Sequence, residues 1–363
     1  MRLIILLMLC IVTSGWFELA FAGDKQPLGL PPVPIPEANP QSPEKVALGK
    51  QLYEDKRFSS DGTVSCSTCH DPLKGFTDHL PVSEGVGKQK GTRNAPTVIN
   101  AAYYTSQFWD GRRPDLESQS KDPLLNPIEH GLKDHGFVIN VIRDDASYPA
   151  SFKEVFGVTP EQITIDHVAL AIASFERTVI AGDSPFDRYL YGGDKTAMSE
   201  SAIRGLDVFR NNGRCADCHK IDPKSAIFTD NKFHNLGVGF KRIEANMFDI
   251  VEKFRIAKNE GNNIDENVLT NAEASELGRF AVTLDTQDLG RFKTSTIRNI
   301  TVTGPFMHDG SQKTLEEVVD FYNQGGEKNP VLDSGIRPLN LTDQEKKDLV
   351  EFMKALTSPQ FVM

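Results

Sequence analysis

Apolar residues recur three and four positions apart in five segments of the chain, a spacing that predicts amphipathic helices. Helix-starting residues stand before most of these segments. Ser42 precedes Pro43 and Glu44, and both Thr314 and Thr342 have a glutamate three positions later, as in a capping box. The predicted helices begin at Ser42, Asp166, Ser199, Thr314 and Thr342 and run to Tyr53, Ile180, Phe209, Tyr322 and Leu356.

The rest of the chain has few strand signals. Runs with strict alternation of apolar and polar residues are short, and turn residues separate the helical segments. We therefore expect a mostly α, loop-rich fold with few short strands. Six prolines between positions 27 and 40 predict an extended arm ahead of the first helix.

The first 22 residues have the pattern of a cleaved export signal. Arg2 precedes an apolar run from Leu3 to Val12, and Ala20-Phe21-Ala22 supplies small residues at the expected cleavage site. The run is too short for a stable membrane span. We expect residues 1–22 to be a signal peptide and the mature protein to act in the periplasm.

The overall composition is that of an ordinary globular protein, with 39% hydrophobic and 25% charged residues in 363. This length corresponds to about two domains. The 50 acidic residues outnumber the 40 basic ones, which gives a net charge of −10. Because nucleic-acid binding needs a basic surface, this balance argues against a nucleic-acid partner.

Cysteine usage indicates a specific cofactor. Four cysteines remain after the signal segment, and they form two C-x-x-C-H motifs, Cys66 to His70 and Cys215 to His219. This motif attaches c-type haem, because two thiols bond to the porphyrin and the adjacent histidine reaches the iron. We therefore expect two covalently bound haem c groups, held by Cys66, Cys69, His70, Cys215, Cys218 and His219.

Two other uses of these cysteines are weaker. An exported protein can pair four cysteines as two disulfides. A zinc site needs its C-x-x-C knuckles about 12–20 residues apart, whereas 145 residues separate Cys69 from Cys215. His135, His167 and His234 show no metal-ligand spacing, and we interpret them as surface or hydrogen-bonded core residues.

A helix precedes each haem motif, so the chain carries a faint internal repeat. We divide it into a proline-rich arm at 23–40, a first cytochrome c-like haem domain at 41–182 and a second at 183–363. The junction falls near Gly182-Asp183-Ser184-Pro185.

The chain resembles the bacterial di-haem cytochrome c peroxidases, and the MauG-like branch in particular. The resemblance extends over nearly the whole mature chain, in an order of segments that is specific to the family. These segments are Arg93-Asn94-Ala95-Pro96-Thr97, Phe108-Trp109-Asp110-Gly111-Arg112, Asn126-Pro127-Ile128-Glu129, Phe175-Glu176-Arg177-Thr178 and His308-Asp309-Gly310.

The resemblance implies that peroxide reacts at the first haem. Standard members block that iron with a second histidine, sixteen residues after the motif histidine, where this chain has Val86; His79 is the local substitute. We therefore expect His70 to be the single protein ligand and the iron to be open. Glu129 matches the distal acid–base, and Gln119 and Pro123 match the other distal positions. His130 replaces the usual methionine, and we interpret it as solvated; tuning of the pocket is the alternative.

The resemblance also implies the ligands of the second haem. Standard peroxidases carry methionine opposite the motif histidine, whereas Tyr322 occupies this position here, as in MauG-like proteins. Tyrosinate, a hard anionic donor, lowers the potential relative to methionine. The alternative is that Tyr322 packs in the core and Met307 or Met247 binds the iron.

Two further features follow from the family. Trp109 matches an aromatic residue between the haems that relays electrons, although a tryptophan in such a turn also serves as a packing anchor. The family binds calcium between the haems, and the matching ligands are the Asn94 side chain and the main-chain oxygens of Thr303 and Pro305; such oxygen ligation suits calcium.

Three functions remain open. The first is a MauG-like enzyme that uses hydrogen peroxide, shares the oxidising equivalents through Trp109 and oxidises a partner protein near the second haem. MauG takes electrons through a tryptophan where this chain has Gly213, so MauG's own reaction does not follow by that route. The second is a peroxide-scavenging peroxidase supplied by small electron carriers, and the third is a non-catalytic electron carrier.

Overall fold

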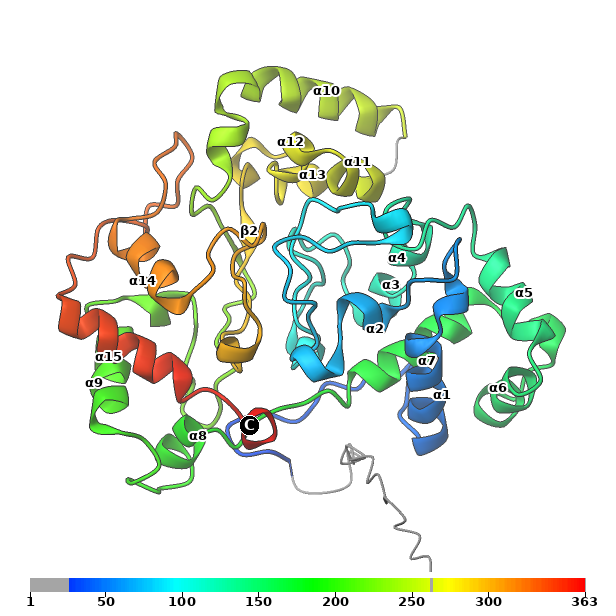
Figure 1. Ribbon diagram of the computed structural model, residues 1–363, viewed down its shortest axis with the longest axis horizontal. Helices are drawn as coiled ribbons and strands as arrows, with labels where there is room; N and C mark the ends of the chain where they lie inside the picture. The colour runs from blue at the N-terminus through cyan, green and yellow to red at the C-terminus, as the bar shows by residue number, and fades with distance from the viewer. Residues whose placement is uncertain (1–25, 262–263, 363) are drawn as a thin grey trace, which may run out of the picture.

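A computed structural model describes residues 26–261 and 264–362, which form a mostly helical, loop-rich molecule (Figure 1). In this part of the chain the regular strands are β1 (Phe233–His234) and β2 (Phe292–Lys293), which pair antiparallel. The predicted fold class is thus confirmed. The predicted signal peptide lies outside the described residues. No helix among the described residues has the length and apolar character that crossing a membrane requires.

The first half of the molecule is built on two packed helices, α1 (Pro43–Glu54) and α7 (Ile165–Glu176). Five shorter helices surround them: α2 (Cys66–Cys69), α3 (Leu116–Gln119), α4 (Asp122–Leu125), α5 (Gly136–Asp144) and α6 (Tyr148–Phe156). Their apolar faces meet in one core, in which Tyr53, Phe152 and Phe175 are buried. This core fixes the direction from which α2 presents the first haem motif.

The second half repeats this plan. Helices α9 (Glu200–Arg210) and α15 (Asp343–Lys354) pack together, and α8 (Pro185–Leu190) and α14 (Leu315–Asn323) lie beside them. A cluster of buried phenylalanines fills the core, including Phe186, Phe209, Phe228 and Phe352.

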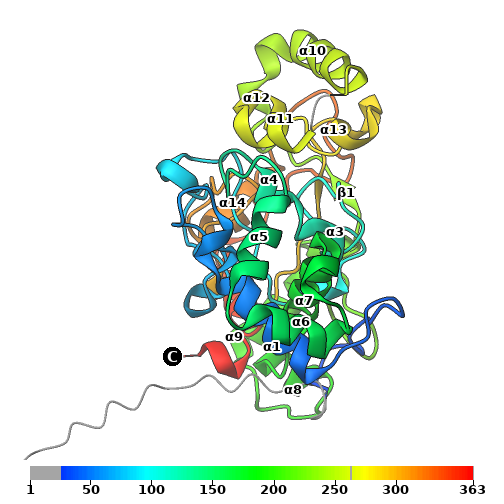
Figure 2. The same cartoon turned by 90° about the vertical axis from the view of Figure 1, so that its right-hand side faces the viewer.

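A third group of helices stands above both halves (Figures 1 and 2). It consists of α10 (Met247–Asn259), α11 (Ile264–Thr270), α12 (Ala272–Ser275) and α13 (Phe280–Thr283). These helices share their own core, with Phe254, Leu277 and Phe280 buried. We call residues 240–289 the helical lobe. The hydrophobic pattern of the sequence did not single out this lobe.

Local capping explains where the predicted helices begin. The hydroxyls of Ser42, Ser199 and Thr342 each accept a hydrogen bond from the main-chain N–H three residues on. Thr314 also caps α14, but the Glu317 carboxylate accepts from the N–H of Lys313 instead of closing the predicted box. Capping therefore marks these starts even where the box is incomplete.

Helix α7 ends at Glu176, four residues before the predicted end. The side chain of Asn100 binds the main chain that follows the helix. Its oxygen accepts a hydrogen bond from the N–H of Ala181, and its nitrogen donates one to the carbonyl of the same residue. These bonds, each 2.9–3.0 Å long, replace the next helical turn.

Each half depends on a glycine where its two long helices cross. A Cβ atom on Gly49 would lie 1.9 Å from the carbonyl oxygen of Ala171 in α7. A Cβ atom on Gly205 would lie 1.9 Å from the carbonyl oxygen of Asp348 in α15. The two helix pairs therefore approach equally closely, and residues of α7 correspond to residues of α15 that are 177 positions later.

The loops also repeat, at an offset of 199 residues. Asn100 and Asn299 both have a left-handed backbone, and both hold the segment that follows a long helix. Gln107 and Arg113 form an isolated antiparallel β-bridge in the first half, and Phe306 and Gln312 form one at the equivalent place in the second. This correspondence pairs Trp109 with His308 and Pro123 with Tyr322.

The proline-rich arm ties the two halves together. The buried guanidinium of Arg298 donates to the carbonyl of Gly29 and forms a two-bond ion pair with Asp187, at 2.7 and 2.8 Å. Further along the arm, the Asn39 side chain donates to Glu117 of the first half.

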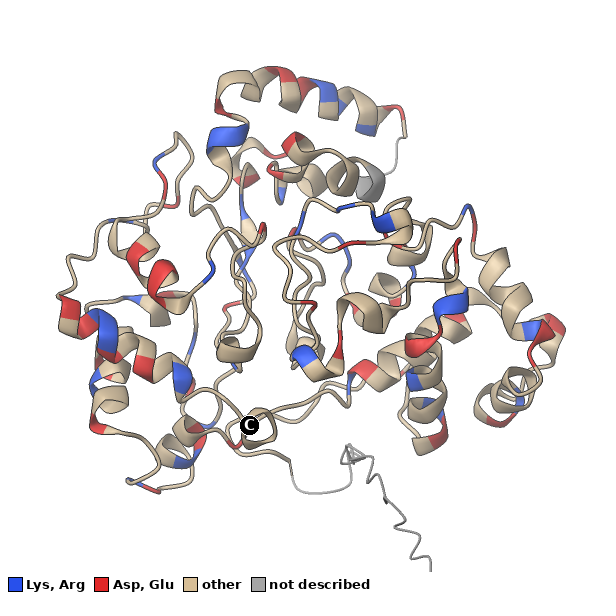
Figure 3. Ribbon diagram, viewed as in Figure 1, with Lys and Arg blue, Asp and Glu red and all other residues tan. Residues whose placement is uncertain are grey.

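Acidic and basic residues are interspersed on the outer helices (Figure 3).

Candidate functional site

Two cavities contain the two C-x-x-C-H motifs. Cys66, Cys69 and His70 line the first cavity, and Cys215, Cys218 and His219 line the second. All four cysteines are free thiols. Because the two pairs face different cavities, the geometry favours neither the disulfide nor the zinc alternative.

The cavities fit haem c in their chemistry. Burial raises the pKa of the Cys69 and Cys215 thiols to about 12, so both are neutral in these apolar surroundings. The Nδ1 atom of His219 lies 2.9 Å from the carbonyl oxygen of Phe228. A proton on Nδ1 leaves Nε2 as the iron ligand. Burial lowers the pKa of both His70 and His219, which keeps the imidazoles in the neutral form that binds metal.

The predicted distal residues of the first haem share one cavity. Gln119, Pro123 and Glu129 all line it together with the first motif. The main-chain N–H of Val86 donates to the carbonyls of Ile128 and Glu129, at 3.0 and 3.1 Å. The segment in which related peroxidases carry a histidine ligand therefore holds the main chain of Glu129 here. His79 is exposed, and its Nε2 lies 3.1 Å from the carbonyl oxygen of Val302.

The interpretation of His130 as a solvated residue was wrong. His130 is 3% exposed and lines the first cavity. Its Nδ1 lies 2.8 Å from the carbonyl oxygen of Phe58, while its main chain bonds to Pro123 and Ser60. Burial lowers the pKa of this imidazole, so a neutral histidine stands beside Glu129. The turn that carries His130 folds back onto the core and buries this side chain, although its polarity alone predicts an exposed position.

Tyr322 and His219 line the second cavity together. Tyr322 is the penultimate residue of α14, and burial raises the pKa of its phenol. Of the two methionine alternatives, Met307 also lines this cavity, whereas Met247 starts α10 and packs against the helical lobe. Gly213 lies at the same cavity, so no side chain stands there.

Trp109 lies between the two cavities and lines both of them. Its indole N–H donates to the carbonyl of Asn94 at 2.9 Å, and its ring meets the His308 ring edge-on, with centroids 6.5 Å apart. The tryptophan is thus anchored, and it also spans the space that separates the two haem sites.

Sequence reasoning missed the support behind Trp109. The Nε2 atom of His308 lies 2.9 Å from a carboxylate oxygen of Glu276, and both side chains are 3% exposed. Glu276 belongs to the helical lobe and also bonds to Arg242, at 2.8 Å. The lobe therefore reaches the region between the cavities. No signal in the sequence could have found this pair, because Glu276 resembles any glutamate in a helical segment.

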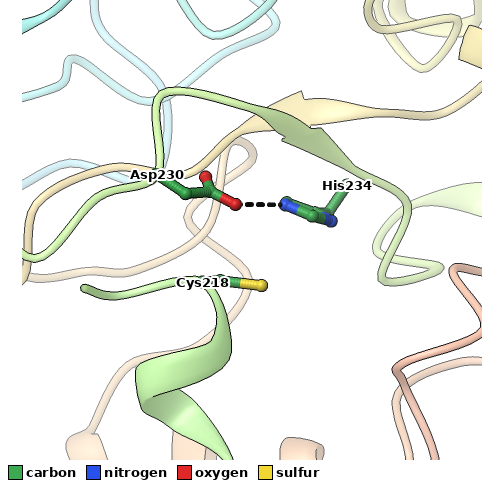
Figure 4. A group of neighbouring side chains, drawn as sticks. All are labelled: Cys218, Asp230 and His234. Carbon is green, nitrogen blue, oxygen red and sulfur yellow. Dashed lines mark hydrogen bonds and ion pairs between the residues drawn. The ribbon is translucent and has the colours of Figure 1, made fainter.

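His234 was another residue that the sequence left without a role. Both of its ring nitrogens face carboxylates, Asp230 at 2.9 Å and Asp333 at 2.8 Å. Figure 4 shows His234 with Asp230 beside Cys218. The Cys218 sulfur and then the two carboxylates raise the pKa of His234 to about 10. Cys218, Asp230 and His234 are close enough to hold a metal ion. Attachment of haem to Cys218 converts this sulfur to a thioether, which removes the thiolate ligand.

The three residues predicted to bind calcium lie along the second cavity. Asn94, Thr303 and Pro305 all line it. The Asn94 amide nitrogen donates to the carbonyl of Leu80 at 2.8 Å, which turns the amide oxygen away from that carbonyl. The donors are oxygen atoms, as calcium prefers.

Comparisons with known proteins agree with this geometry. Residues 43–196 match the family described as di-haem cytochrome c peroxidase. The chain is 38% identical to cytochrome-c peroxidase IdrP1 of Denitromonas iodatirespirans, over 93% of this chain and 89% of that protein. It is 36% identical to the methylamine utilization protein MauG of Methylorubrum extorquens, over 89% and 81%.

Solved structures extend the comparison to the fold. A MauG-like protein associated with microbial copper homeostasis superimposes with a TM-score of 0.75 at 33% identity, over 94% of this chain and 96% of that one. The diheme peroxidase BthA of Burkholderia thailandensis gives a TM-score of 0.69 at 23% identity, covering 89% and 88%, which supports the fold alone. The predicted resemblance is confirmed: the chain belongs to the family of di-haem cytochrome c peroxidases and MauG, whose members carry two c-type haems.

Proposed function

We propose that this protein is a MauG-like oxidoreductase that reduces hydrogen peroxide in its first cavity and oxidises a partner protein near its second. The observation that carries the proposal is the joint placement of His70 and Glu129 in one cavity, with Val86 in place of a blocking ligand. The subtype and the partner go beyond what family membership establishes.

Glu129 performs the proton transfer in this proposal. His70 would hold the haem iron, which would supply the electrons for cleavage of the peroxide O–O bond. Glu129 accepts a proton from one peroxide oxygen and returns it to the other, which leaves as water. The hydrogen bonds from Val86 hold the carboxylate-bearing loop in place. Gln119 and Pro123 shape the remaining wall of the cavity.

Trp109 and Tyr322 distribute the oxidising equivalents. Trp109 borders both cavities, so its ring offers the electron path between them. Tyr322 and His219 would hold the second haem iron together, and a phenolate would favour its oxidised form. We assign calcium to Asn94, Thr303 and Pro305, where it would brace the segments between the cavities.

The electron donor in this proposal is a protein substrate or a small carrier protein in the periplasm. It docks near the second cavity, because the first is reserved for peroxide. Gly213 carries no side chain at that cavity, so the donor's electrons enter by a route that differs from the tryptophan of MauG.

Electron paramagnetic resonance of the ferric protein, before and after one equivalent of peroxide, tests the proposal. We expect one high-spin and one low-spin haem, and loss of both signals after peroxide. Two low-spin haems that peroxide leaves unchanged would contradict the open site and favour an electron carrier.

A peroxide-scavenging role is the second candidate, favoured by the similarity to cytochrome-c peroxidase IdrP1. Steady-state turnover with reduced cytochrome c separates the two roles. Rapid turnover would favour scavenging, whereas slow turnover in a protein that reacts quickly with peroxide supports oxidation of a dedicated partner.

A further inference from the structure

A buried acid faces the first haem cavity on the side of α7, and the proposed peroxide chemistry does not use it. Ile172 and Glu176 lie one helical turn apart and both line the cavity. Glu176 is 6% exposed, and within the described part of the chain its Oε2 atom has no hydrogen-bond partner. Since a buried, unpaired carboxylate is costly, the arrangement calls for a proton on this group.

The corresponding wall of the second cavity has no acid. At the offset of 177 residues, Leu349 and Met353 of α15 take the places of Ile172 and Glu176, and both line the second cavity. The supporting helix crossing is the same in both halves. The two cavities therefore differ at this position, and the shared helix packing does not require the acid.

The cation next to Glu176 is engaged with another carboxylate. The neighbouring Arg177 is turned to Glu117, with which it forms bonds of 2.7 and 2.8 Å. The Glu117 carboxylate also acts on Glu176 and, as a like charge, disfavours its ionised form. Tyr53 on α1 and Cys66 on α2 interact with Glu176 as well, and Glu129 acts on Cys66 from its own loop. Burial, which outweighs Arg177, raises the pKa of Glu176 to about 8.

We propose that Glu176 is the proton-holding acid of the first haem, which binds a proton when that haem is reduced and releases it when the haem is oxidised. Oxidation removes one electron from the haem and adds a positive charge to the cavity. That charge favours the carboxylate, so one proton leaves Glu176 for solvent. Reduction reverses both steps, with one electron and one proton taken up. The inference needs haem attachment at the first motif and is independent of the peroxide reaction.

The test is a spectroelectrochemical titration of the haem-loaded protein without peroxide, repeated from about pH 6 to about pH 10. With one proton coupled to one electron, the midpoint potential of the first haem falls by up to about 59 mV for each tenfold drop in proton concentration, between the two pKa values of Glu176. The second haem, which faces Met353, is the internal reference. A flat first-haem potential in the wild type would overturn the proposal.

Three variants assign the proton. Glu176→Gln keeps the size of the side chain, and Glu176→Met copies the second half; both are expected to abolish the slope. Glu129→Gln is expected to keep it, so a slope that survives in Glu176→Gln and disappears in Glu129→Gln would assign the proton to Glu129 and refute the proposal. The reciprocal change Met353→Glu is expected to give the second haem a slope of its own, which tests the idea even if neither Glu176 variant folds.

Discussion

The two halves of this protein share one scaffold and differ where their side chains face the cofactor. In the second half, α14 runs unbroken from Leu315 to Asn323 and carries Tyr322 into the cavity. In the first half the equivalent segment is split into α3 and α4, and Pro123 takes the corresponding place. Proline offers no ligand atom. Under the proposed function, the same fold thus provides one site closed by Tyr322 and one open site.

The other differences follow the same division. Glu129 and Glu176 line the first cavity, while the second has Met353 in place of Glu176 and carries its acids, Asp217 and Asp333, elsewhere on its wall. Trp109 and His308 are equivalent loop residues, yet Trp109 borders both cavities whereas His308 borders the second. Under the proposed function, this comparison assigns the proton transfer to the first half and the binding of the second iron by Tyr322 to the other.

The largest effect is expected from removing the acid–base of the open half. Glu129→Gln should slow the reaction of the first haem with peroxide by about 10²- to 10⁴-fold, the usual contribution of general acid–base catalysis. Stopped-flow absorbance measures this rate. Glu154→Gln, at an exposed position of α6, serves as the control. An unchanged rate in Glu129→Gln would show that the two cavities do not differ in proton transfer as we describe.

The closed half is tested at Tyr322. Tyr322→Met should raise the midpoint potential of the second haem by a sizeable part of the roughly 0.8 V range that axial ligands control, because a thioether replaces an anionic oxygen. The first haem should change little. Tyr189→Phe, a tyrosine that packs against the core of the same half, is the matched control. If the potential of the second haem stays constant, Tyr322 is a packing residue. The exchange of Tyr322 for Pro123 between the halves would then not explain a difference in iron ligation.

The sequence predicts most of what is local. The haem-attachment residues are contiguous motifs, and the starts of the long helices depend on capping residues within one turn, so both could be inferred without a structure. The end of α7 could not, because Asn100, more than seventy residues earlier, replaces the last predicted turn. The burial of His130 has the same origin, since it depends on contacts with Phe58 and Ser60.

The support between the cavities was also beyond reach of the sequence. Glu276 meets His308 only because the helical lobe folds over both halves. Three of its four helices have seven residues or fewer, and no side chain caps the start of its long helix, α10. Residues that act through tertiary contact were missed, whereas residues that belong to a motif were found.

The shared scaffold can be tested at its two helix crossings. Gly49→Ala and Gly205→Ala each place a methyl group 1.9 Å from a carbonyl oxygen, and each should cost about 1–3 kcal/mol of unfolding free energy despite the helix propensity of alanine. Thermal unfolding of the haem-loaded protein measures the loss. Gly91→Ala is the control, because its added carbon lies 3.7 Å from its nearest neighbour. Stabilisation by either substitution would mean that the two halves do not pack alike.

The smallest expected effect is a pH dependence of stability at the crossing of the second half, which the crossing of the first half should lack. Asp348, at the crossing of the second half, bonds to Arg204 at 2.8 and 2.9 Å, whereas the first half has Ala171 there. The hydrogen bonds from Arg204 lower the pKa of Asp348 to about 2. Its contribution to stability is therefore complete above the unfolded-state pKa of about 3.9 and is lost as the pH falls through 2.

Asp348→Asn should accordingly cost about 1 kcal/mol near neutral pH, a modest value because Arg204 is half-exposed and water screens the pair. The difference in Tm between wild type and variant should shrink as the solution is acidified, since the wild-type carboxylate becomes protonated. Asp343→Asn, an exposed residue of the same helix, should show neither the loss nor the pH trend. A Tm difference that stays constant down to acid pH would mean that Asp348 stabilises the crossing as a neutral group, and the two crossings would then not differ in their dependence on charge.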